Sequence, residues 1–222
     1  VATGARPFVP PIQGIDKINY YTSDNLWELR EKPKKMVVLG GGPIGSELTQ
    51  SFNRLGVDVT QVEMAPRLMG REDPEISELV LQKFTNEGVN VLVNHRAKKV
   101  IVKNGVNILV AEHEGEEIEI PFDTLLVAVG RAPNTAGFGL EELGVRLSSN
   151  GTIEVDEYLQ TSIPTIYACG DVAGPYQFTH TAAHQAWYTS VNSLFGIARR
   201  FKVDYSIIPW ATFIEPEVGR VG

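Results

Sequence analysis

Three closely spaced glycines are the residues of this chain whose spacing points most directly to chemistry. Gly40, Gly42 and Gly45 fit the pattern G-x-G-x-x-G within the run Gly40-Gly41-Gly42-Pro43-Ile44-Gly45. In this pattern the first glycine permits a tight turn, the second lets main chain approach a pyrophosphate, and the third lets a helix pack on a strand. A helix that begins here directs unpaired N–H groups and the positive end of its dipole at the anion. The run therefore predicts a dinucleotide-binding turn.

An acidic residue follows at the distance that such a site requires. Glu63 comes 18 residues after Gly45, at the end of a run rich in β-branched residues. A carboxylate in this place can accept hydrogen bonds from both ribose hydroxyls, and it would repel a 2′-phosphate. We therefore predict NAD as the cofactor, while Arg67 and Arg71 lie close enough in the sequence to keep NADP as the less favoured alternative. The alternative without a ligand is a plain turn beside a solvated glutamate.

Regular elements around the turn place these residues. Residues 35 to 39 form a short apolar strand, and a helix is expected over residues 43 to 55, with Ile44, Leu48, Phe52 and Leu55 on one face. Residues 57 to 63 make a second strand, so the three elements form a βαβ unit with parallel strands.

The sequence after Glu63 continues the same architecture. A second helix begins at Asp73-Pro74-Glu75, with a buried side made of Ile76, Leu79, Val80 and Phe84. A third strand follows at residues 89 to 93. From residue 98 to 120 the apolar period changes to two, with turns at Asn104-Gly105 and Gly115, which predicts an antiparallel meander. Residues 124 to 129 and 165 to 170 read as further buried strands, and residues 181 to 195 as a helix.

Composition limits the classes of partner. The chain has 222 residues, 43% of them hydrophobic, and a net charge of −7, which disfavours nucleic acid and anionic membranes as partners. No apolar run is long enough to span a bilayer, so we expect a soluble, cytoplasmic protein that binds small molecules. The chain starts without Met at Val1 and stops at Gly222 without a recognisable domain end, so we expect that both ends were cut.

Two further features suggest chemistry but favour structural roles. Cys169 is the one cysteine, which excludes an internal disulfide and a cysteine-based metal site, and its apolar surroundings predict a small core residue. His180 and His184 stand four residues apart, a possible metal spacing on a helix. No third ligand accompanies them in the sequence, so we predict no metal site.

Several segments together resemble the class I pyridine nucleotide-disulfide oxidoreductases, the family of dihydrolipoamide dehydrogenase, glutathione reductase and mercuric reductase. The resemblance covers essentially the whole chain. Besides the glycine turn, it rests on four segments in a specific order: Ala2-Thr3-Gly4-Ala5-Arg6-Pro7, Val129-Gly130-Arg131-Ala132-Pro133-Asn134, Ile166-Tyr167-Ala168-Cys169-Gly170-Asp171-Val172 and Phe213-Ile214-Glu215-Pro216-Glu217-Val218.

The resemblance implies an α/β fold, with a three-layer Rossmann-like NAD-binding domain that contains the meander and is flanked by incomplete FAD-domain segments. It assigns residues 33–150 to the NAD-binding domain, 1–32 and 151–202 to parts of the FAD domain, and 203–222 to the start of a truncated dimerisation domain. A homodimer is expected for the full-length enzyme.

Site residues follow from the resemblance, position by position. Val100 and Gly130 would line the NAD site. The residues expected at FAD are Thr3, Gly4, Ala5, Asp171, Phe178, Thr179, His180 and Thr181. Glu47 matches the family's glutamate that pairs with a lysine beside the flavin, a lysine expected before residue 1. Pro43 stands where some members carry a tyrosine lid over the flavin, so that lid is absent.

The activity implied is hydride transfer from NADH to flavin, and onward to a disulfide or another acceptor. The redox cysteine pair and the histidine-glutamate couple of the family are missing from these residues, so the chain by itself should be inactive in disulfide chemistry. Two alternatives stay open. One is a flavin NADH oxidase or quinone reductase without a catalytic disulfide, and the other is a standalone NAD-binding module.

Overall fold

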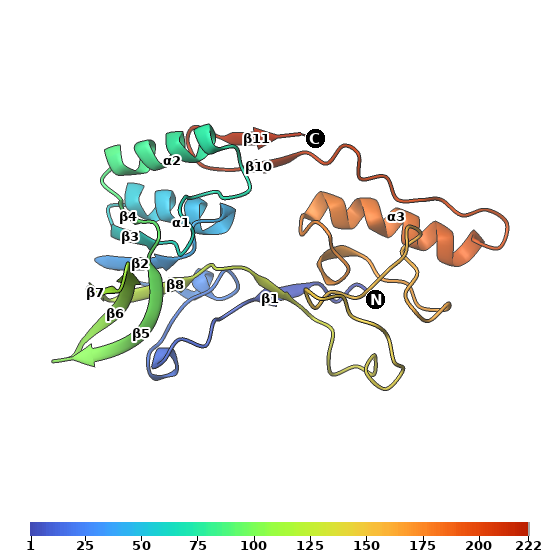
Figure 1. Ribbon diagram of the computed structural model, residues 1–222, viewed down its shortest axis with the longest axis horizontal. Coiled ribbons are helices and arrows are strands. Elements are labelled where there is room, and N and C mark those ends of the chain that lie inside the picture. The colour runs from blue at the N-terminus through green and yellow to red at the C-terminus, as the bar shows by residue number, and fades with distance from the viewer. Residues whose placement is uncertain (222) are drawn as a thin grey trace. The chain divides into compact units, whose positions relative to one another are not determined.

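A computed structural model describes residues 1–221, which form two compact units. One unit contains Pro7–Gly130 together with Ala211–Val218, and the other contains Val1–Arg6, Arg131–Trp210 and residues 219–221. We call them the nucleotide unit and the α3 unit and describe each by itself. Figure 1 labels their helices and strands.

The centre of the nucleotide unit is a parallel four-stranded sheet in the order β4-β3-β2-β8. Its strands are β2 (Lys35–Leu39), β3 (Asp58–Val62), β4 (Asn90–Leu92) and β8 (Thr124–Val127). Helix α1 (Pro43–Arg54) connects β2 to β3, and helix α2 (Pro74–Asn86) connects β3 to β4. The βαβ unit predicted from the sequence is therefore present, with its strands in parallel register.

A meander of three antiparallel strands forms a second sheet, made of β5 (Arg96–Lys103), β6 (Val106–His113) and β7 (Glu116–Phe122). Both of its turns contain two residues with positive φ, at Asn104-Gly105 and Glu114-Gly115. Turns of this kind match the twist of the strands that they join, and asparagine and glycine tolerate the left-handed backbone best. The predicted meander and its turn positions are confirmed.

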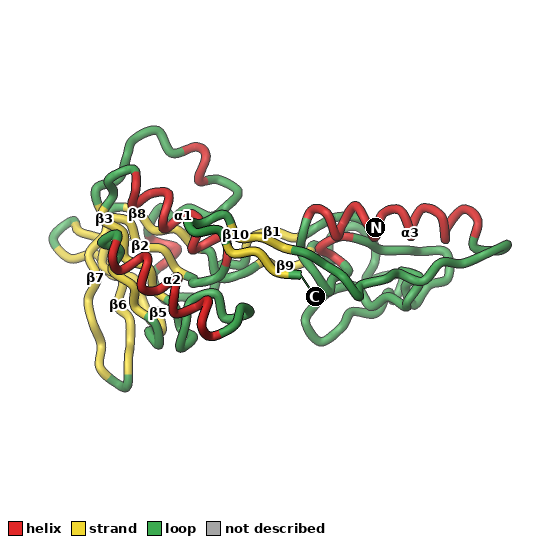
Figure 2. Tube along the Cα trace, turned by 90° about the horizontal axis from the view of Figure 1, so that it is seen from above, coloured by secondary structure: helices red, strands yellow, loops and turns green. Residues whose placement is uncertain are grey.

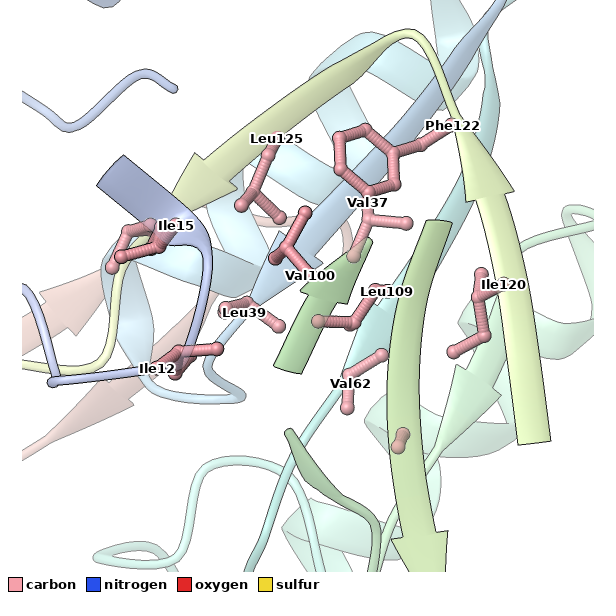
Figure 3. Packing of buried hydrophobic residues seen from close by; sticks show 12 residues of the cluster. Ile12, Ile15, Val37, Leu39, Val62, Val100, Leu109, Ile120, Phe122 and Leu125 are labelled. Atoms are coloured by element: carbon pink, nitrogen blue, oxygen red, sulfur yellow. The ribbon is translucent and has the colours of Figure 1, made fainter. Parts of the chain in front are cut away.

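The main core of the unit lies between the parallel sheet and the meander (Figure 3). Val37 and Leu39 of β2 face Leu109 and Ile120 of the meander, with Ile12 and Ile15 closing one end. The alternate residues of β2, Met36 and Val38, pack with Leu48 and Phe52 of α1. Helices, parallel sheet and meander thus make three layers, and the predicted α/β fold is confirmed.

Residues close to the C-terminus complete the helix side of the nucleotide unit. Ile214 and Val218 are buried with Phe84 of α2 and with the loop residues Leu68 and Met69. The short strands β10 (Trp210–Thr212) and β11 (Val218–Arg220) flank this stretch. Gln50 of α1 makes two hydrogen bonds with the main chain of Glu215, at 2.7 and 3.0 Å. A segment that is remote in the sequence therefore becomes part of this layer.

An ion pair on this side gives the unit a pH dependence. The Arg54 guanidinium lies 2.6 Å from Glu87 and lowers the pKa of that carboxyl from its ordinary 4.5 to about 2; partial burial opposes the shift, and Lys83 and Gln50 add to it. Because the pKa is lower in the folded chain, this stabilisation is complete above pH 4.5 and disappears as the pH falls towards 2.

We therefore expect the free energy of unfolding to fall over this pH range, with a contribution from Glu87 of roughly 1 to 2 kcal/mol after screening at the partly exposed Arg54. Urea denaturation at several pH values would measure it. Glu87→Gln should show a shallower slope between pH 4.5 and 2, and identical slopes would contradict the assignment.

The α3 unit has less regular structure. It contains α3 (Thr179–Phe195), the 3₁₀ turn η3 (Gly170–Val172), the strand β9 (Arg131–Pro133) and the first two residues of its partner strand β1 (Ala5–Pro7). In the tube view of Figure 2, loops make up most of the rest of this unit. Its core is formed by Leu140, Val145, Ile153, Ala168, Val172 and Ala173. Two more 3₁₀ turns, η1 (Ile15–Lys17) and η2 (Leu26–Glu28), belong to the nucleotide unit.

Three predictions of local structure are wrong. The expected strand at residues 165 to 170 is an irregular segment, in which Tyr167 forms an isolated bridge and Cys169 donates its N–H to the carbonyl of Val1. A strand needs a neighbouring strand, and among the described residues this segment meets loops instead.

The other two errors concern helix faces. Ile44 and Leu55, at the ends of the predicted apolar stripe of α1, are exposed, and Leu79 of α2 is 56% exposed. The prediction for Val80 and Phe84 is correct, since both are buried. The helix expected over residues 181 to 195 is confirmed and begins two residues earlier, at Thr179.

Candidate nucleotide-binding site

The turn between β2 and α1 has the geometry that the three glycines predicted. Gly40 has a φ of 111°, and a Cβ atom built on it would lie 2.4 Å from the carbonyl oxygen of Ala128. A Cβ on Gly45 would lie 2.2 Å from the carbonyl oxygen of Gly40. Both positions therefore require glycine for close main-chain packing, at the turn and between helix and strand.

The start of α1 is open. Gly42 is its N-cap residue, no side chain caps the helix, and a Cβ on Gly42 would meet nothing within 4 Å. Pro43 at the first helical position has no N–H to satisfy, and both Pro43 and Ile44 are exposed. The helix thus presents its N-terminus to free space, which is the arrangement that binds phosphate groups.

The carboxylate of Glu63 lies at this turn. It accepts hydrogen bonds from the main-chain N–H of Gly41 at 2.5 Å and from that of Ala65 at 2.6 Å. Glu63 is partly exposed, directly after the end of β3. A carboxylate has about four acceptor positions, so about two stay free for hydroxyl donors. The predicted pairing of acid and glycine turn is therefore present in the folded chain.

Gly41, an unrestricted position of the motif, proves to be constrained by its surroundings. A Cβ there would lie 2.6 Å from Cδ2 of Leu68 and 3.0 Å from the side chain of Glu63. The carbonyl of Gly41 accepts a 2.7 Å hydrogen bond from the N–H of Met69. The loop after β3 therefore folds over the peptide of Gly41 and holds it from both sides.

Sequence reasoning missed Gln61. Its side chain is fully buried and donates a 3.0 Å hydrogen bond to the carbonyl of Gly40, with a longer bond to the Ser46 hydroxyl. The buried amide of Gln61 thus supplies a hydrogen-bond donor to the carbonyl of Gly40 inside the protein. A glutamine in a run of buried strand residues was the signal that could have found it.

The other two residues expected at NAD have different settings. Val100 is buried in the core between the sheets (Figure 3). Its N–H donates to the carbonyl of Gln13. Gly130 has a φ of 140°, a Cβ atom built on it would meet nothing within 4 Å, and its carbonyl accepts a 2.9 Å hydrogen bond from the N–H of Phe8. Their contact with a nucleotide stays a prediction.

In the α3 unit, Arg131 brings together several residues expected at FAD. Its side chain donates to the carbonyl of Ala5, and its Nε lies 3.4 Å from the carboxylate of Asp171. The Thr3 hydroxyl donates to the carbonyl of Asn134, whose N–H donates to the carbonyl of Gly4. The three N-terminal residues and Asp171 are thus joined within one unit.

The remaining residues expected at FAD form the start of α3. Phe178 is the N-cap residue, no side chain caps this helix, and its ring stacks on that of His180 with centroids 5.4 Å apart. Thr179 and His180 are exposed. Thr181 is fully buried, and its hydroxyl has no hydrogen-bond partner among the described residues.

Glu47 lies on the side of α1 that the C-terminal segment covers. Its carboxylate accepts a 2.8 Å hydrogen bond from the N–H of Phe213. The lysine expected from the family resemblance would come from outside these 222 residues. The role of Glu47 beside a flavin therefore stays a prediction.

The cysteine and the helix histidines have ordinary structural settings. Cys169 is buried, which confirms it as a core residue. A ring nitrogen of His184 lies 2.9 Å from the carbonyl of Asp204. Within residues 1–221, no three histidine, cysteine or acidic side chains are grouped as a metal site would need, and none of the helices has the length and apolarity to cross a membrane.

Comparison with known proteins defines the class. The model of the family described as pyridine nucleotide-disulphide oxidoreductase matches residues 1–186, and the chain belongs to this family. A mercuric reductase of Staphylococcus aureus is 40% identical over 222 residues, which are 100% of this chain and 40% of that protein. A dihydrolipoyl dehydrogenase of Mycobacterium leprae (strain TN) is 35% identical over 223 residues, covering 100% of this chain and 47% of that protein.

A solved structure agrees with these relatives. The Cu(II) complex of the HOCl-induced flavoprotein disulfide reductase RclA from Escherichia coli has a TM-score of 0.90 and 32% identity, covering 100% of this chain and 50% of that chain. The predicted family resemblance is thus confirmed. The chain spans half of the length of these relatives or less.

Proposed function

We propose that this chain is the nicotinamide-nucleotide-binding part of an FAD-dependent oxidoreductase. The nucleotide unit binds NADH, with its pyrophosphate at the open start of α1 and its adenosine ribose at Glu63. The observation that carries this proposal is the Glu63 carboxylate hydrogen-bonded to Gly41, inside the glycine turn. One carboxylate thus lies beside an anion-binding helix start, where a dinucleotide presents sugar and phosphate together.

The geometry favours NADH over NADPH. A 2′-phosphate would approach the Glu63 carboxylate, and like charges in contact repel. The guanidinium of Arg67, which could otherwise pair with that phosphate, donates a 3.1 Å hydrogen bond to the carbonyl of Gly70. We therefore propose that the chain binds NADPH at least tenfold more weakly than NADH.

Flavin would be held by the residues of the α3 unit. The uncapped start of α3 supplies free N–H groups, and the buried, unpaired Thr181 hydroxyl is next to them in sequence. Asp171 offers a carboxylate for hydroxyl groups of the ribityl chain. The two cofactors would supply the chemistry, a hydride transfer from NADH to flavin, and each unit would hold its own cofactor. The final acceptor is a disulfide or another oxidant, in a homodimeric, cytoplasmic enzyme.

Isothermal titration of the chain with NADH and with NADPH tests the proposal. We expect NADH to bind and NADPH to bind at least tenfold more weakly. Binding of NADPH without NADH would contradict the role of Glu63. A longer chain that contains residues before Val1 should hold yellow flavin that NADH bleaches, and a colourless protein that binds NADH would favour a standalone nucleotide-binding module.

Glu63→Ala should raise the dissociation constant of NADH by a factor of about 5 to 150, the effect of losing charged hydrogen bonds worth about 1 to 3 kcal/mol. Titration calorimetry measures the change. Glu78→Ala removes the same charge from an exposed position of α2 and should leave the affinity unchanged. Equal affinity of Glu63→Ala and the unaltered chain would refute the assignment. Glu63→Gln keeps the side chain's size but sets an amide NH2 against one of the two main-chain N–H donors, so thermal unfolding of both variants separates a loss of affinity from a collapse of the turn.

A further inference from the structure

Two loops at the end of the parallel sheet are joined beside Glu63. The N–H of Asn94 donates to the carbonyl of Ala65 at 3.0 Å, and the N–H of His95 donates to the carbonyl of Glu63 at 3.0 Å. The N–H of Ala65 in turn donates to the Glu63 carboxylate. The loop that carries the acid is therefore fastened to the loop between β4 and β5.

A histidine of the meander extends this connection. Nδ1 of His113, at the end of β6, lies 3.0 Å from the carbonyl oxygen of Asn94. A carbonyl can only accept, so this nitrogen carries the proton. Hydrogen bonds then run without a break from His113 through Asn94 and Ala65 to the Glu63 carboxylate, whose other oxygen holds Gly41.

The two imidazoles are fixed in position by each other. His95 and His113 stack with ring centroids 4.6 Å apart and planes 12° apart. Nδ1 of His95 lies 2.7 Å from the carbonyl oxygen of Val93, so both rings carry their proton on Nδ1. Each ring thus has one hydrogen bond and one stacking partner, which leaves His113 little freedom to turn away from Asn94.

Asn94 has an unusual backbone that makes the connection possible. Its φ is 58°, in the left-handed region that asparagine enters more readily than other residues with a side chain. In this conformation its N–H reaches Ala65 while its carbonyl reaches His113. Asn94 is exposed and belongs to none of the apolar core clusters of the described residues. A strained residue outside the core points to a role in holding the two loops together.

We propose that His113 and Asn94 are positioning residues for nucleotide binding: they hold the loop after β3 so that the Glu63 carboxylate stays at the glycine turn. This inference rests on the proposed function. An acid held in place before the ligand arrives loses less conformational freedom on binding, so the connection raises the affinity for NADH.

A double-mutant cycle on the chain tests this inference, with NADH titrated calorimetrically. His113→Phe keeps a flat ring for stacking and removes the N–H donor, and it should weaken NADH binding about fivefold, as expected for one lost hydrogen bond. His113→Asn places an amide N–H near the original Nδ1 and should restore the affinity to within about twofold. In the Glu63→Gln background, His113→Phe should have no further effect, because His113 acts through that acid.

Controls separate this role from a general effect on folding. His184→Phe breaks a similar bond between a ring nitrogen and a carbonyl, in the α3 unit, and should leave NADH affinity unchanged. Thermal unfolding of each variant checks that it is folded. An unchanged affinity in His113→Phe, or equal losses in both backgrounds, would overturn the inference alone. Failure of the unaltered chain to bind NADH would overturn the proposed function as well.

Discussion

Gly45→Ala is expected to destabilise the nucleotide unit by about 3 kcal/mol, a typical cost of forcing an extra methyl group into a packed site. The new Cβ would lie 2.2 Å from the carbonyl oxygen of Gly40, and both groups belong to main chain that cannot rotate away. Helix α1 would have to move off β2. Urea denaturation followed by circular dichroism measures the loss.

Gly42→Ala is the matched control for this prediction. Its Cβ enters open space at a φ of −78°, so the free energy of unfolding should change by less than about 1 kcal/mol. The same methyl group would occupy the space in which the pyrophosphate approaches main chain, so NADH affinity should fall at least tenfold. A Gly45→Ala chain as stable as the original would show that helix and strand are less tightly packed than these distances imply.

Phe84→Ala is expected to cost about 4 kcal/mol of folding stability, within the range for deleting a buried aromatic ring. Phe84 of α2 is fully buried and packs with the loop residues Leu68 and Met69 and with Ile214. Because the same loop folds over the glycine turn, part of the damage should appear as weaker NADH binding. Denaturation and calorimetry on one preparation measure both effects.

Leu79→Ala provides the comparison on the same helix. Leu79 is 56% exposed, so its truncation should change stability by less than about 0.5 kcal/mol. A cost for Leu79→Ala close to that for Phe84→Ala would mean that α2 is turned about its axis, with Leu79 on its buried side as the sequence pattern alone had suggested.

Local sequence patterns predicted the elements that depend on local physics. The strand of residues 35 to 39 has the predicted bounds, the helix begins at Pro43 as the proline rule requires, and both meander turns lie at the predicted positions. The pairing of Glu63 with the glycine turn was also predictable, because the βαβ unit fixes the separation between strand ends.

Features that depend on remote contacts could not be predicted in this way. Gln50 is buried on a side of α1 that looked polar, because its amide binds the main chain of Glu215, 165 residues later. Gly41 is restricted by Leu68, whose position depends on the path of a loop. The connection through His113 and Asn94 joins two sheets, and periodicity within one strand carries no information about it.

The assignment of cofactors to residues stays a prediction at both sites. Along the chain, one boundary between the two compact units falls between residues 130 and 131, whereas the family resemblance placed the end of the NAD-binding domain at residue 150. Nucleotide titration of the Glu63, Gly42 and His113 variants tests whether each of these residues contributes to NADH binding.

The attachment of residues 211–218 to the nucleotide unit has a consequence for synthesis on the ribosome. The rest of that unit is complete at Gly130, but Ile214 and Val218 emerge about 90 residues later. Translation proceeds at roughly 5 to 20 residues per second, so synthesis of these residues takes roughly 4 to 18 s. Until it is complete, Leu68, Met69 and Phe84 lack part of their buried packing. During this interval the nascent chain exposes an apolar surface to chaperones and to neighbouring chains.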